Sequence, residues 1–187
     1  MKKLVLVLLL AALMTAGAFA QHPDGWGVGL GFSFGGNWRE SGTDSGLTLY
    51  LKAPKLPIYW GINANLFDWE FGNPSFFGFR VTGDYLFIDR ALVPDAKLGW
   101  FLGVGGYVGF WRYSFDSAWV DYSYSLFDVG VRVPVGLYWM PLDFLEVFLD
   151  IAPSLGFYNR SVSGTGLESR SGLGGGWQGD LGIRFWF

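Results

Sequence analysis

The chain has 187 residues and a formal net charge of −3, with one histidine and no cysteine. These values exclude a disulfide framework, a zinc site built from Cys and His ligands, a Ser-His catalytic triad and an electrostatic attraction to nucleic acid. Hydrophobic residues make up 51% of the sequence. After residue 20, however, no segment approaches the ~18 consecutive apolar residues that a membrane-spanning helix needs.

The N-terminus has the features of a secretory signal peptide. Two lysines precede a short apolar core, and Ala18-Phe19-Ala20 provides a small-residue cleavage site. We expect residues 1–20 to be removed before Gln21, and residues 21–187 to form one domain with no cysteine for lipid attachment. His22 follows the cleavage site and is interpreted as part of a disordered leader remnant.

From residue 25 onward, segments with period-two hydrophobicity alternate with polar or glycine-rich connections. Eight strands are predicted, over residues 25–35, 47–53, 58–67, 77–87, 97–111, 124–139, 145–158 and 177–187. The long connections are residues 36–46, 68–75, 112–123 and 159–175, and the short ones are residues 54–57, 88–96 and 140–144. This alternation predicts an all-β, antiparallel up-and-down barrel with both termini on the side of the short turns.

Two connections need separate comment. The turn at residues 88–96 is long for its side of the barrel and fits the pattern least well. Residues 159–175 are rich in glycine and serine, so they are expected to form the most flexible loop.

The two faces of the predicted strands differ in a consistent way. Large apolar residues share one face, whereas glycines and charged residues share the other. In soluble barrels such as lipocalins the apolar face lines a ligand cavity. An eight-stranded barrel has little room inside, so small residues suit its lumen and the large apolar residues must face outward. A water-soluble protein does not expose so much contiguous apolar surface, and we therefore predict a transmembrane barrel.

Outward aromatic residues near the strand ends are expected to form two interfacial girdles. One comprises Trp26, Trp60, Phe87, Trp100, Trp139 and Phe185, and the other Phe34, Phe77, Phe110, Phe157 and Trp177.

The inward charges predict an ion-pair network in the lumen, because buried charges are retained only when they are paired. Arg184 is expected to contact Glu146 or Asp150 on the neighbouring strand. The network is interpreted as a structural plug, and a gated proton or ion path is the less favoured alternative. Its members are Lys52, Arg80, Asp84, Asp128, Arg132, Glu146, Asp150, Asp180 and Arg184.

The last eleven residues alternate apolar and polar side chains and end on an aromatic. This pattern resembles the C-terminal strand of bacterial outer-membrane β-barrels, in which a terminal aromatic acts as an insertion signal. The residues that match the signal here are Leu181, Ile183, Phe185 and Phe187. The same strand is expected to close the barrel against residues 25–35.

Taken together, these strands and turns resemble the small eight-stranded outer-membrane barrels, such as the OmpA transmembrane domain, OmpX and OmpW. Residues 130–139 and 145–153 are more specifically similar to small barrels of spirochaetes. The resemblance implies a monomer in the lipid of the bacterial outer membrane, inserted by periplasmic chaperones and the barrel-assembly machinery. It supplies no catalytic motif.

The sequence therefore predicts a non-enzymatic barrel with a plugged polar lumen and a structural or surface-binding role. Barrel enzymes use histidine near the outer rim, and no histidine is expected there. Cofactors and metals are not expected either, since two carboxylates in a polar loop are usually just solvated. The candidate surface-binding loop contains Arg112, Tyr113, Phe115, Asp116, Trp119, Asp121 and Tyr122. The alternative is an OmpW-like channel for small apolar molecules.

Overall fold

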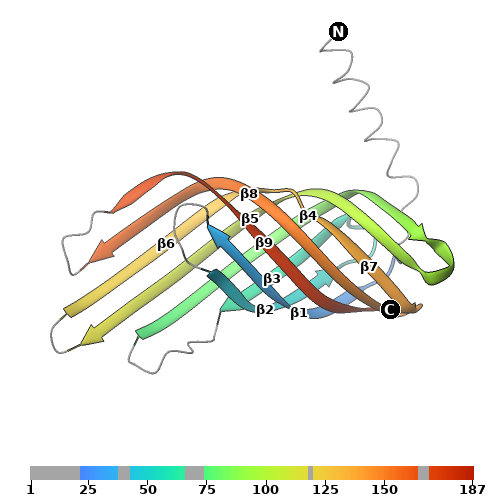
Figure 1. The fold of residues 1–187 in the computed structure, drawn as a ribbon, viewed down its shortest axis with the longest axis horizontal. Coiled ribbons are helices and arrows are strands. Elements are labelled where there is room, and N and C mark those ends of the chain that lie inside the picture. The colour runs from blue at the N-terminus through green and yellow to red at the C-terminus, as the bar shows by residue number, and fades with distance from the viewer. Residues whose placement is uncertain (1–21, 38–42, 66–73, 118–119, 164–168) are drawn as a thin grey trace, which may run out of the picture.

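A computed structural model describes residues 22–37, 43–65, 74–117, 120–163 and 169–187. The chain forms one antiparallel sheet (Figure 1). Its elements are β1 (Gly27–Asn37), β2 (Thr43–Lys52), β3 (Ile58–Asn65), β4 (Pro74–Val93), the 3₁₀ turn η2 (Pro94–Ala96), β5 (Leu98–Ser117), β6 (Val120–Arg132), β7 (Val135–Leu142), β8 (Leu145–Ser163) and β9 (Arg170–Trp186). No helix among the described residues is long and apolar enough to cross a membrane.

The sheet closes into a barrel because β1 pairs with both β2 and β9, and β4 pairs with both β3 and β5. The nine strand elements form eight barrel strands, because β6 and β7 lie end to end in one position and both pair with β5 on one side and β8 on the other. The eight-stranded up-and-down barrel predicted from the sequence is confirmed. We call the end with the β1–β2, β3–β4, β5–β6 and β8–β9 connections the outer end, and the other, which holds the C-terminus, the inner end.

The strand predicted at residues 124–139 is interrupted by Val133 and Pro134. Proline has no N–H for the ladder, so it breaks a regular strand. Two backbone hydrogen bonds hold the wall together here: Val133 N donates to the Pro153 carbonyl (3.0 Å), and Gly103 N donates to the Pro134 carbonyl (2.8 Å).

Several strands are longer than predicted. β4 continues to Val93, so the turn predicted at residues 88–96 is wrong for residues 88–93, and η2 makes the turn within the last part of that range. The register of β4 on β5 shifts between Leu86 and Ile88. This irregularity interrupts the period-two pattern that would have revealed the rest of the strand.

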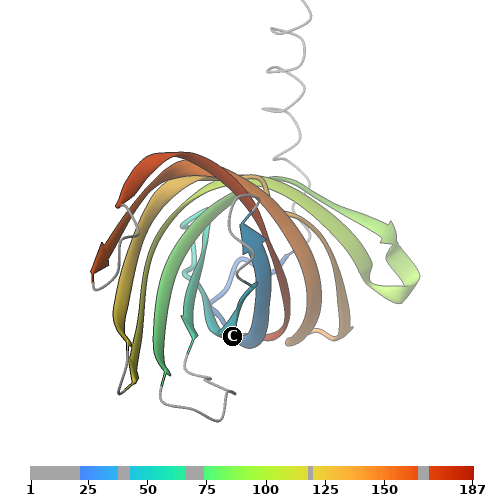
Figure 2. The ribbon, with the colours of Figure 1, turned by 60° about the vertical axis from the view of Figure 1, so that its left-hand side comes forward.

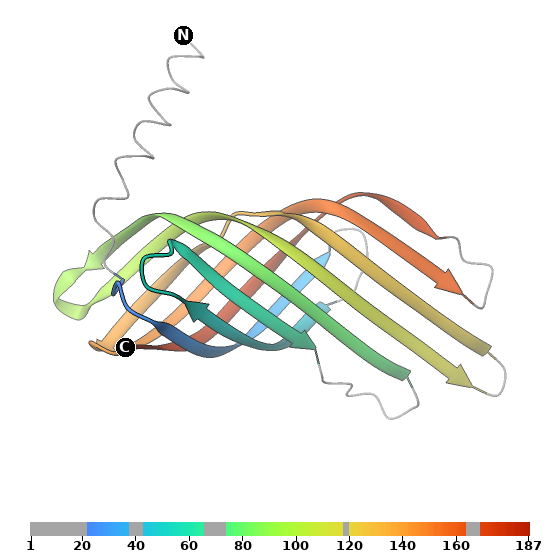
Figure 3. The same ribbon diagram turned by 180° about the vertical axis from the view of Figure 1, so that it is seen from behind.

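The outer end is extended on one side of the barrel only. β3 ends opposite Gly78 of β4, and the last pair of β1 joins Asn37 to Gly176 of β9. The longer strands β4, β5, β6, β8 and β9 continue beyond these points (Figure 3). Most of the loops predicted at residues 112–123 and 159–175 are therefore strand, except for residues 118–119 and 164–168, which lie outside the described residues. At the inner end, the β4–β5 turn leans away from the barrel wall (Figure 2).

The apolar face is outside, as the sequence predicts. Leu30 is 63% exposed and Val131 is 58% exposed, whereas Thr48 and Glu146 are almost completely buried in the lumen. The outward girdle residues Trp26 and Trp139 are also exposed.

Inside the barrel, aromatic side chains lie directly opposite glycines on neighbouring strands. A Cβ on Gly182 would meet the Phe148 ring at 2.7 Å, and one on Gly99 would meet the Tyr138 ring still more closely. The glycines thus make room for rings that cover the bare backbone. This arrangement explains how glycines and large inward aromatic residues fill one narrow lumen together. The opposed pairs are Tyr50–Gly61, Phe101–Gly136, Tyr107–Gly130, Trp111–Gly78, Tyr138–Gly99, Phe148–Gly182 and Tyr158–Gly172.

Candidate functional site

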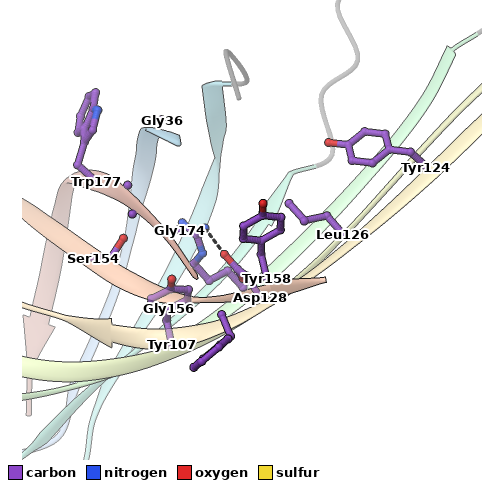
Figure 4. Close-up of a pocket in the computed structure, with 14 residues that line it drawn as sticks. Gly36, Tyr107, Tyr124, Leu126, Asp128, Ser154, Gly156, Tyr158, Gly174 and Trp177 are labelled. Carbon is purple, nitrogen blue, oxygen red and sulfur yellow. Dashed lines mark ion pairs between the residues drawn. The ribbon is translucent and has the colours of Figure 1, made fainter. Parts of the chain in front are cut away.

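The candidate site is the lumen, whose polar side chains form three layers from the outer to the inner end. In the outer layer, Nη2 of Arg80 lies 3.5 Å from Oδ2 of Asp128 (Figure 4). The Arg80 guanidinium also lies over the rings of Trp111 and Tyr107, 4.6 and 5.3 Å from their centroids. This arrangement combines an ion pair with cation–π contacts, which fix the guanidinium in one place.

A cavity of about 60 Å³ lies over this layer, toward the outer end. Its floor carries Arg80 and Asp128, and its walls include Tyr124, Tyr158 and the glycines at 174–176 (Figure 4). The cavity therefore offers hydroxyl groups, a guanidinium and a carboxylate to a polar group from outside.

The middle layer is centred on Arg132 of β6, which is 3% exposed. Three carboxylates from three strands surround it: Asp84 at 3.3 Å, Asp180 at 3.4 Å and Asp150 at 3.9 Å. Its Nη1 also donates to Oε1 of Gln178 (2.9 Å), which in turn accepts from Arg80 (3.3 Å). The outer and middle layers are thus connected through one side chain that the sequence-based network lacked.

A chain of hydrogen bonds joins this layer to the opposite wall. Asn63 donates to the Thr48 hydroxyl (2.9 Å), Thr48 is hydrogen-bonded to Ser33, and Ser33 donates to Asp180. Because Ser33 gives its only proton to Asp180, Thr48 must be the donor in the central bond. Polar groups from four strands, β1, β2, β3 and β9, are satisfied by this chain.

Below the middle layer, large rings fill the lumen. Tyr50 and Phe148 pack edge to face, with centroids 4.8 Å apart, and Phe101 is buried beside them. The cavity between these rings and Arg132 measures about 30 Å³. A space of this size holds one or two water molecules and no larger solute.

The inner layer is built around Glu146 of β8, which is 0% exposed. Nη1 of Arg184 lies 2.8 Å from Oε1 of Glu146, and the Trp186 indole donates to Oε2 at 2.7 Å. Arg184 therefore contacts one of the two carboxylates that the sequence proposes for it. Its guanidinium also lies over the rings of Phe148 and Tyr59, at 4.7 and 5.1 Å.

His22 completes the inner layer, so its interpretation as a disordered remnant is wrong. The residue is buried, with Nδ1 2.7 Å from Oδ2 of Asp89 and Nε2 3.4 Å from Oε1 of Glu146. Burial lowers the pKa of His22, but Glu146 and the hydrogen bond with Asp89 outweigh it and raise the pKa to about 9. The imidazole is therefore protonated at neutral pH.

The sequence of this chain matches a known family over most of its length. The model of the family described as "Protein of unknown function (DUF3996)" matches residues 47–185. The chain belongs to this family. No curated protein sequence is significantly similar to it.

The fold of this DUF3996 member is similar to that of solved outer-membrane proteins. A major outer membrane protein from Thermus thermophilus is 16% identical, with a TM-score of 0.52 over 87% of this chain and 98% of that one. This likeness shows the fold. Neisserial surface protein A (NspA) is 10% identical, with a TM-score of 0.48 over 88% and 98% of the two chains. Ail, the attachment invasion locus protein of Yersinia pestis, is 15% identical, with a TM-score of 0.45 over 86% and 97%.

The structure brings together most of the predicted lumen residues of this DUF3996 member. Eight of these nine residues lie in the three layers. The ninth, Lys52, lies at the inner end, where its ammonium donates to the Ala53 carbonyl (2.9 Å) and faces the Tyr59 ring. Asp89, His22 and Gln178 were not among the predicted lumen residues, although they belong to the same network.

The candidate surface-binding loop is not a loop where it is described. Arg112 and Tyr113 lie on β5, opposite Ser125 and Tyr124 of β6, and the two tyrosine rings are 6.1 Å apart. Phe115, Asp116, Asp121 and Tyr122 have strand backbones but no described side chains, and Trp119 lies outside the described residues.

The insertion-signal residues Leu181, Ile183, Phe185 and Phe187 all face outward. Their role in insertion stays a prediction. The predicted signal peptide at residues 1–20 and its cleavage site lie outside the described residues.

Proposed function

We propose that this chain is an integral protein of the bacterial outer membrane that has no open pore and acts, without catalysis, through its outer surface. Export by a cleaved signal peptide, and insertion by periplasmic chaperones and the barrel-assembly machinery into outer-membrane lipid as a monomer, are parts of the same proposal.

The membrane location is supported by the outward face of the barrel. Leucine, valine, phenylalanine and tryptophan side chains cover this face from β1 around to β9. Contiguous apolar surface of this extent is unfavourable in water and is the surface that lipid chains solvate.

The observation that carries the closed-lumen proposal is the middle layer. Arg132 lies within 4 Å of Asp84, Asp150 and Asp180 and also binds Gln178. A solute would have to displace this network, and breaking a buried ion pair costs about 3–5 kcal/mol. The rings of Tyr50 and Phe148 then block the space below it.

Two features of the outer end support a surface-binding role. Strands β4, β5, β6, β8 and β9 continue beyond β1–β3, so they present polar and aromatic side chains such as Tyr113 and Tyr124 past the barrel mouth. The outer cavity adds Arg80 and Asp128 to this surface.

An OmpW-like channel for small apolar molecules is the alternative. Its specific support is an apolar groove of about 620 Å³ that includes Phe34, Trp100 and Leu149. These side chains belong to the outward face, however, and the cavity at the outer mouth is lined by polar groups. The groove is therefore better suited to lipid chains than to a route through the lumen.

Conductance in a planar bilayer tests the closed lumen. The refolded mature chain should give no steady current. The variant Arg132→Ala/Tyr50→Ala/Phe148→Ala/His22→Gly, which removes side chains from the middle layer, from the rings below it and from the inner mouth, should conduct and so show that insertion is detectable. Val131→Ala, which alters an outward neighbour of Arg132, should stay silent. Steady current through the wild-type protein would overturn the proposal of a closed lumen.

Topology on intact cells tests the membrane location. A peptide tag inserted between residues 118 and 119, at the β5–β6 connection, should bind antibody on unbroken cells. The same tag in the turn at residues 53–57 should bind only after the outer membrane is opened. Equal accessibility of the two tags, or recovery of the protein in the soluble fraction, contradicts the proposal.

A further inference from the structure

The segment at residues 22–26, before β1, enters the inner mouth of the barrel. At its start, both the backbone N–H of His22 (3.0 Å) and ring atom Nδ1 (2.7 Å) contact Oδ2 of Asp89. At its end, Trp26 and the C-terminal Phe187 exchange two backbone hydrogen bonds, of 3.1 and 2.8 Å. The segment is thus attached to the barrel at both ends.

The surroundings of the His22 ring match the chemistry of a planar cation. Its two nitrogens face carboxylate oxygens on different strands, Asp89 on β4 and Glu146 on β8. Nδ1 lies within hydrogen-bond distance of Asp89, and Nε2 lies near the Glu146 carboxylate without a hydrogen bond, so the two negative charges together favour the protonated ring. Four aromatic rings surround the imidazole, and the nearest, Tyr138, is 4.1 Å from it between centroids. The others are Tyr59, Trp186 and Phe101, at 5.7, 5.8 and 6.2 Å.

The strands that pack against His22 contribute both acceptors and cations, and each cation is held by a partner. The Tyr138 hydroxyl of β7 donates to the second oxygen of Asp89 (2.8 Å), so that oxygen is already engaged. Arg184 of β9 shares Glu146 with His22. Tyr59 of β3 presents its ring, while Lys52 of β2 directs its ammonium to the Ala53 carbonyl. Loss of the imidazolium would remove one contact from Asp89 and one from Glu146, while the backbone N–H of residue 22 could still donate to Asp89.

The segment also separates two spaces at the inner mouth. A cavity of about 360 Å³ on one side is lined by His22, Pro23, Lys52 and Asp89 among others. A cavity of about 480 Å³ on the other side is lined by Pro23, Tyr138 and Asp143 among others. Pro23 lines both cavities, so the segment lies beside each of them.

We propose that the inner mouth is a binding site for an imidazolium ion, that His22 occupies this site in cis, and that its docking closes the inner end of the lumen. The ligand class is a planar cation with two opposed N–H donors and faces that stack on aromatic rings. This site is separate from the middle layer, so its opening exposes the inner cavities without creating a pore.

Chemical rescue tests the site. The mature chain has no cysteine, so Lys52→Cys would give one thiol beside the inner cavity. In vesicles open to the inner side, His22→Gly should increase its reaction rate with a charged thiol reagent at least about tenfold, because a hydrogen bond to a charged group is lost. Added imidazole should restore slow labelling, and 1,3-dimethylimidazolium, which lacks N–H donors, should not. Labelling that is equally slow in His22→Gly, or unaffected by imidazole, would overturn the proposal.

A second measurement does not depend on the variant folding. His22 is the only histidine in the chain, so its ring nitrogens are the only imidazole signals in a ¹⁵N-labelled, tag-free protein. Both should be protonated at pH 8 in the wild-type barrel, and Asp89→Asn should lower the pH at which they titrate. A wild-type ring that titrates as free histidine does would show that the site is empty. Neither result depends on conductance, so this inference and the proposed closed lumen can fail separately.

Discussion

Arg184 and Glu146 occupy directly opposite positions on β9 and β8, and their side chains meet inside the lumen with Nη1 2.8 Å from Oε1. The guanidinium is also enclosed by the rings of Phe148, Tyr59 and Trp186. A planar cation fits this space, whereas the rounder and more strongly hydrated ammonium of lysine does not.

Arg184→Ala should therefore lower the free energy of unfolding by roughly 3–5 kcal/mol, because Glu146 stays buried with one partner fewer. Arg184→Lys should recover only part of this loss. Urea unfolding in lipid vesicles, followed by tryptophan fluorescence, measures both. Arg170→Ala, on the exposed outer part of the same strand, is the control and should change little. A similar loss in the control would show that charge on β9, rather than this contact, determines stability.

Deletion of Phe187 should act at a different stage. This residue is 81% exposed and belongs to the apolar C-terminal pattern. Its loss should slow assembly into the outer membrane, while Arg184→Ala should be targeted normally and be less stable once folded. Pulse-labelled cells, assayed for the heat-modifiable folded form, separate the two effects. If both variants assemble at the same reduced rate, the two roles are not distinct.

Two glycines on β9 provide a matched test of ring packing. Gly182→Ala would place a Cβ 2.7 Å from the Phe148 ring and 3.0 Å from the Leu30 carbonyl oxygen. This overpacking should cost about 1–3 kcal/mol. Gly172→Ala would meet only ordinary contacts, at 3.8 Å from Tyr158. It should be neutral or slightly stabilising in the same unfolding assay. Equal effects would mean that strand glycines matter for backbone freedom and not for the rings.

The three carboxylates around Arg132 should not be equivalent. Asp180 accepts hydrogen bonds from Ser33, Gln178 and Arg132, whereas Asp150 reaches Arg132 only at 3.9 Å. Arg132 places a single positive charge among the three carboxylates, so removal of one negative charge relieves the repulsion between these carboxylates.

Asp150→Asn should therefore leave the free energy of unfolding at neutral pH unchanged or higher. Asp180→Asn should lower it by about 1–3 kcal/mol, because a well-bonded buried acceptor is replaced. The reverse order of the two variants would contradict the assignment.

Much of the barrel could be predicted because each strand alternates between an apolar outward face and a face that lines the lumen. On β2, the outward residues Leu47, Leu49 and Leu51 are enough to orient the strand. On β8 and β9, the same alternation places Glu146 and Arg184 on the lumen face, and antiparallel pairing of the two strands brings them close together. The strand order follows from the short and long connections.

The strand pattern is not visible in the sequence where this alternation is interrupted. The irregularity at Leu86–Ile88 changes the parity of β4, so Asp89 was assigned to a turn although it points into the lumen. Pro94 and Pro134 were the available signals for the true turn and for the interrupted strand. Beyond the barrel mouth no apolar face is required, so the ends of β5, β6, β8 and β9 resemble loops.

His22 was missed for a different reason. Residues before the first strand have no periodicity, and the partners of His22 lie 67 and more positions away in sequence. Nothing local distinguishes a docked histidine from a solvated one, and only the closed barrel brings Asp89 and Glu146 to the same point.

The contacts of His22 also predict how stability depends on pH. Its pKa rises from 6.5 to about 9 on folding. A group with a raised pKa contributes stability that is fully present below pH 6.5 and is lost as the pH rises through 9. The shift corresponds to about 3 kcal/mol. The free energy of unfolding of the wild-type barrel should therefore decrease between these two pH values. His22→Gln should be less stable at pH 6 and should lack most of this decrease, since glutamine keeps its hydrogen-bonding groups but does not titrate. An identical pH profile in the two proteins would show that His22 carries no charge in the folded barrel.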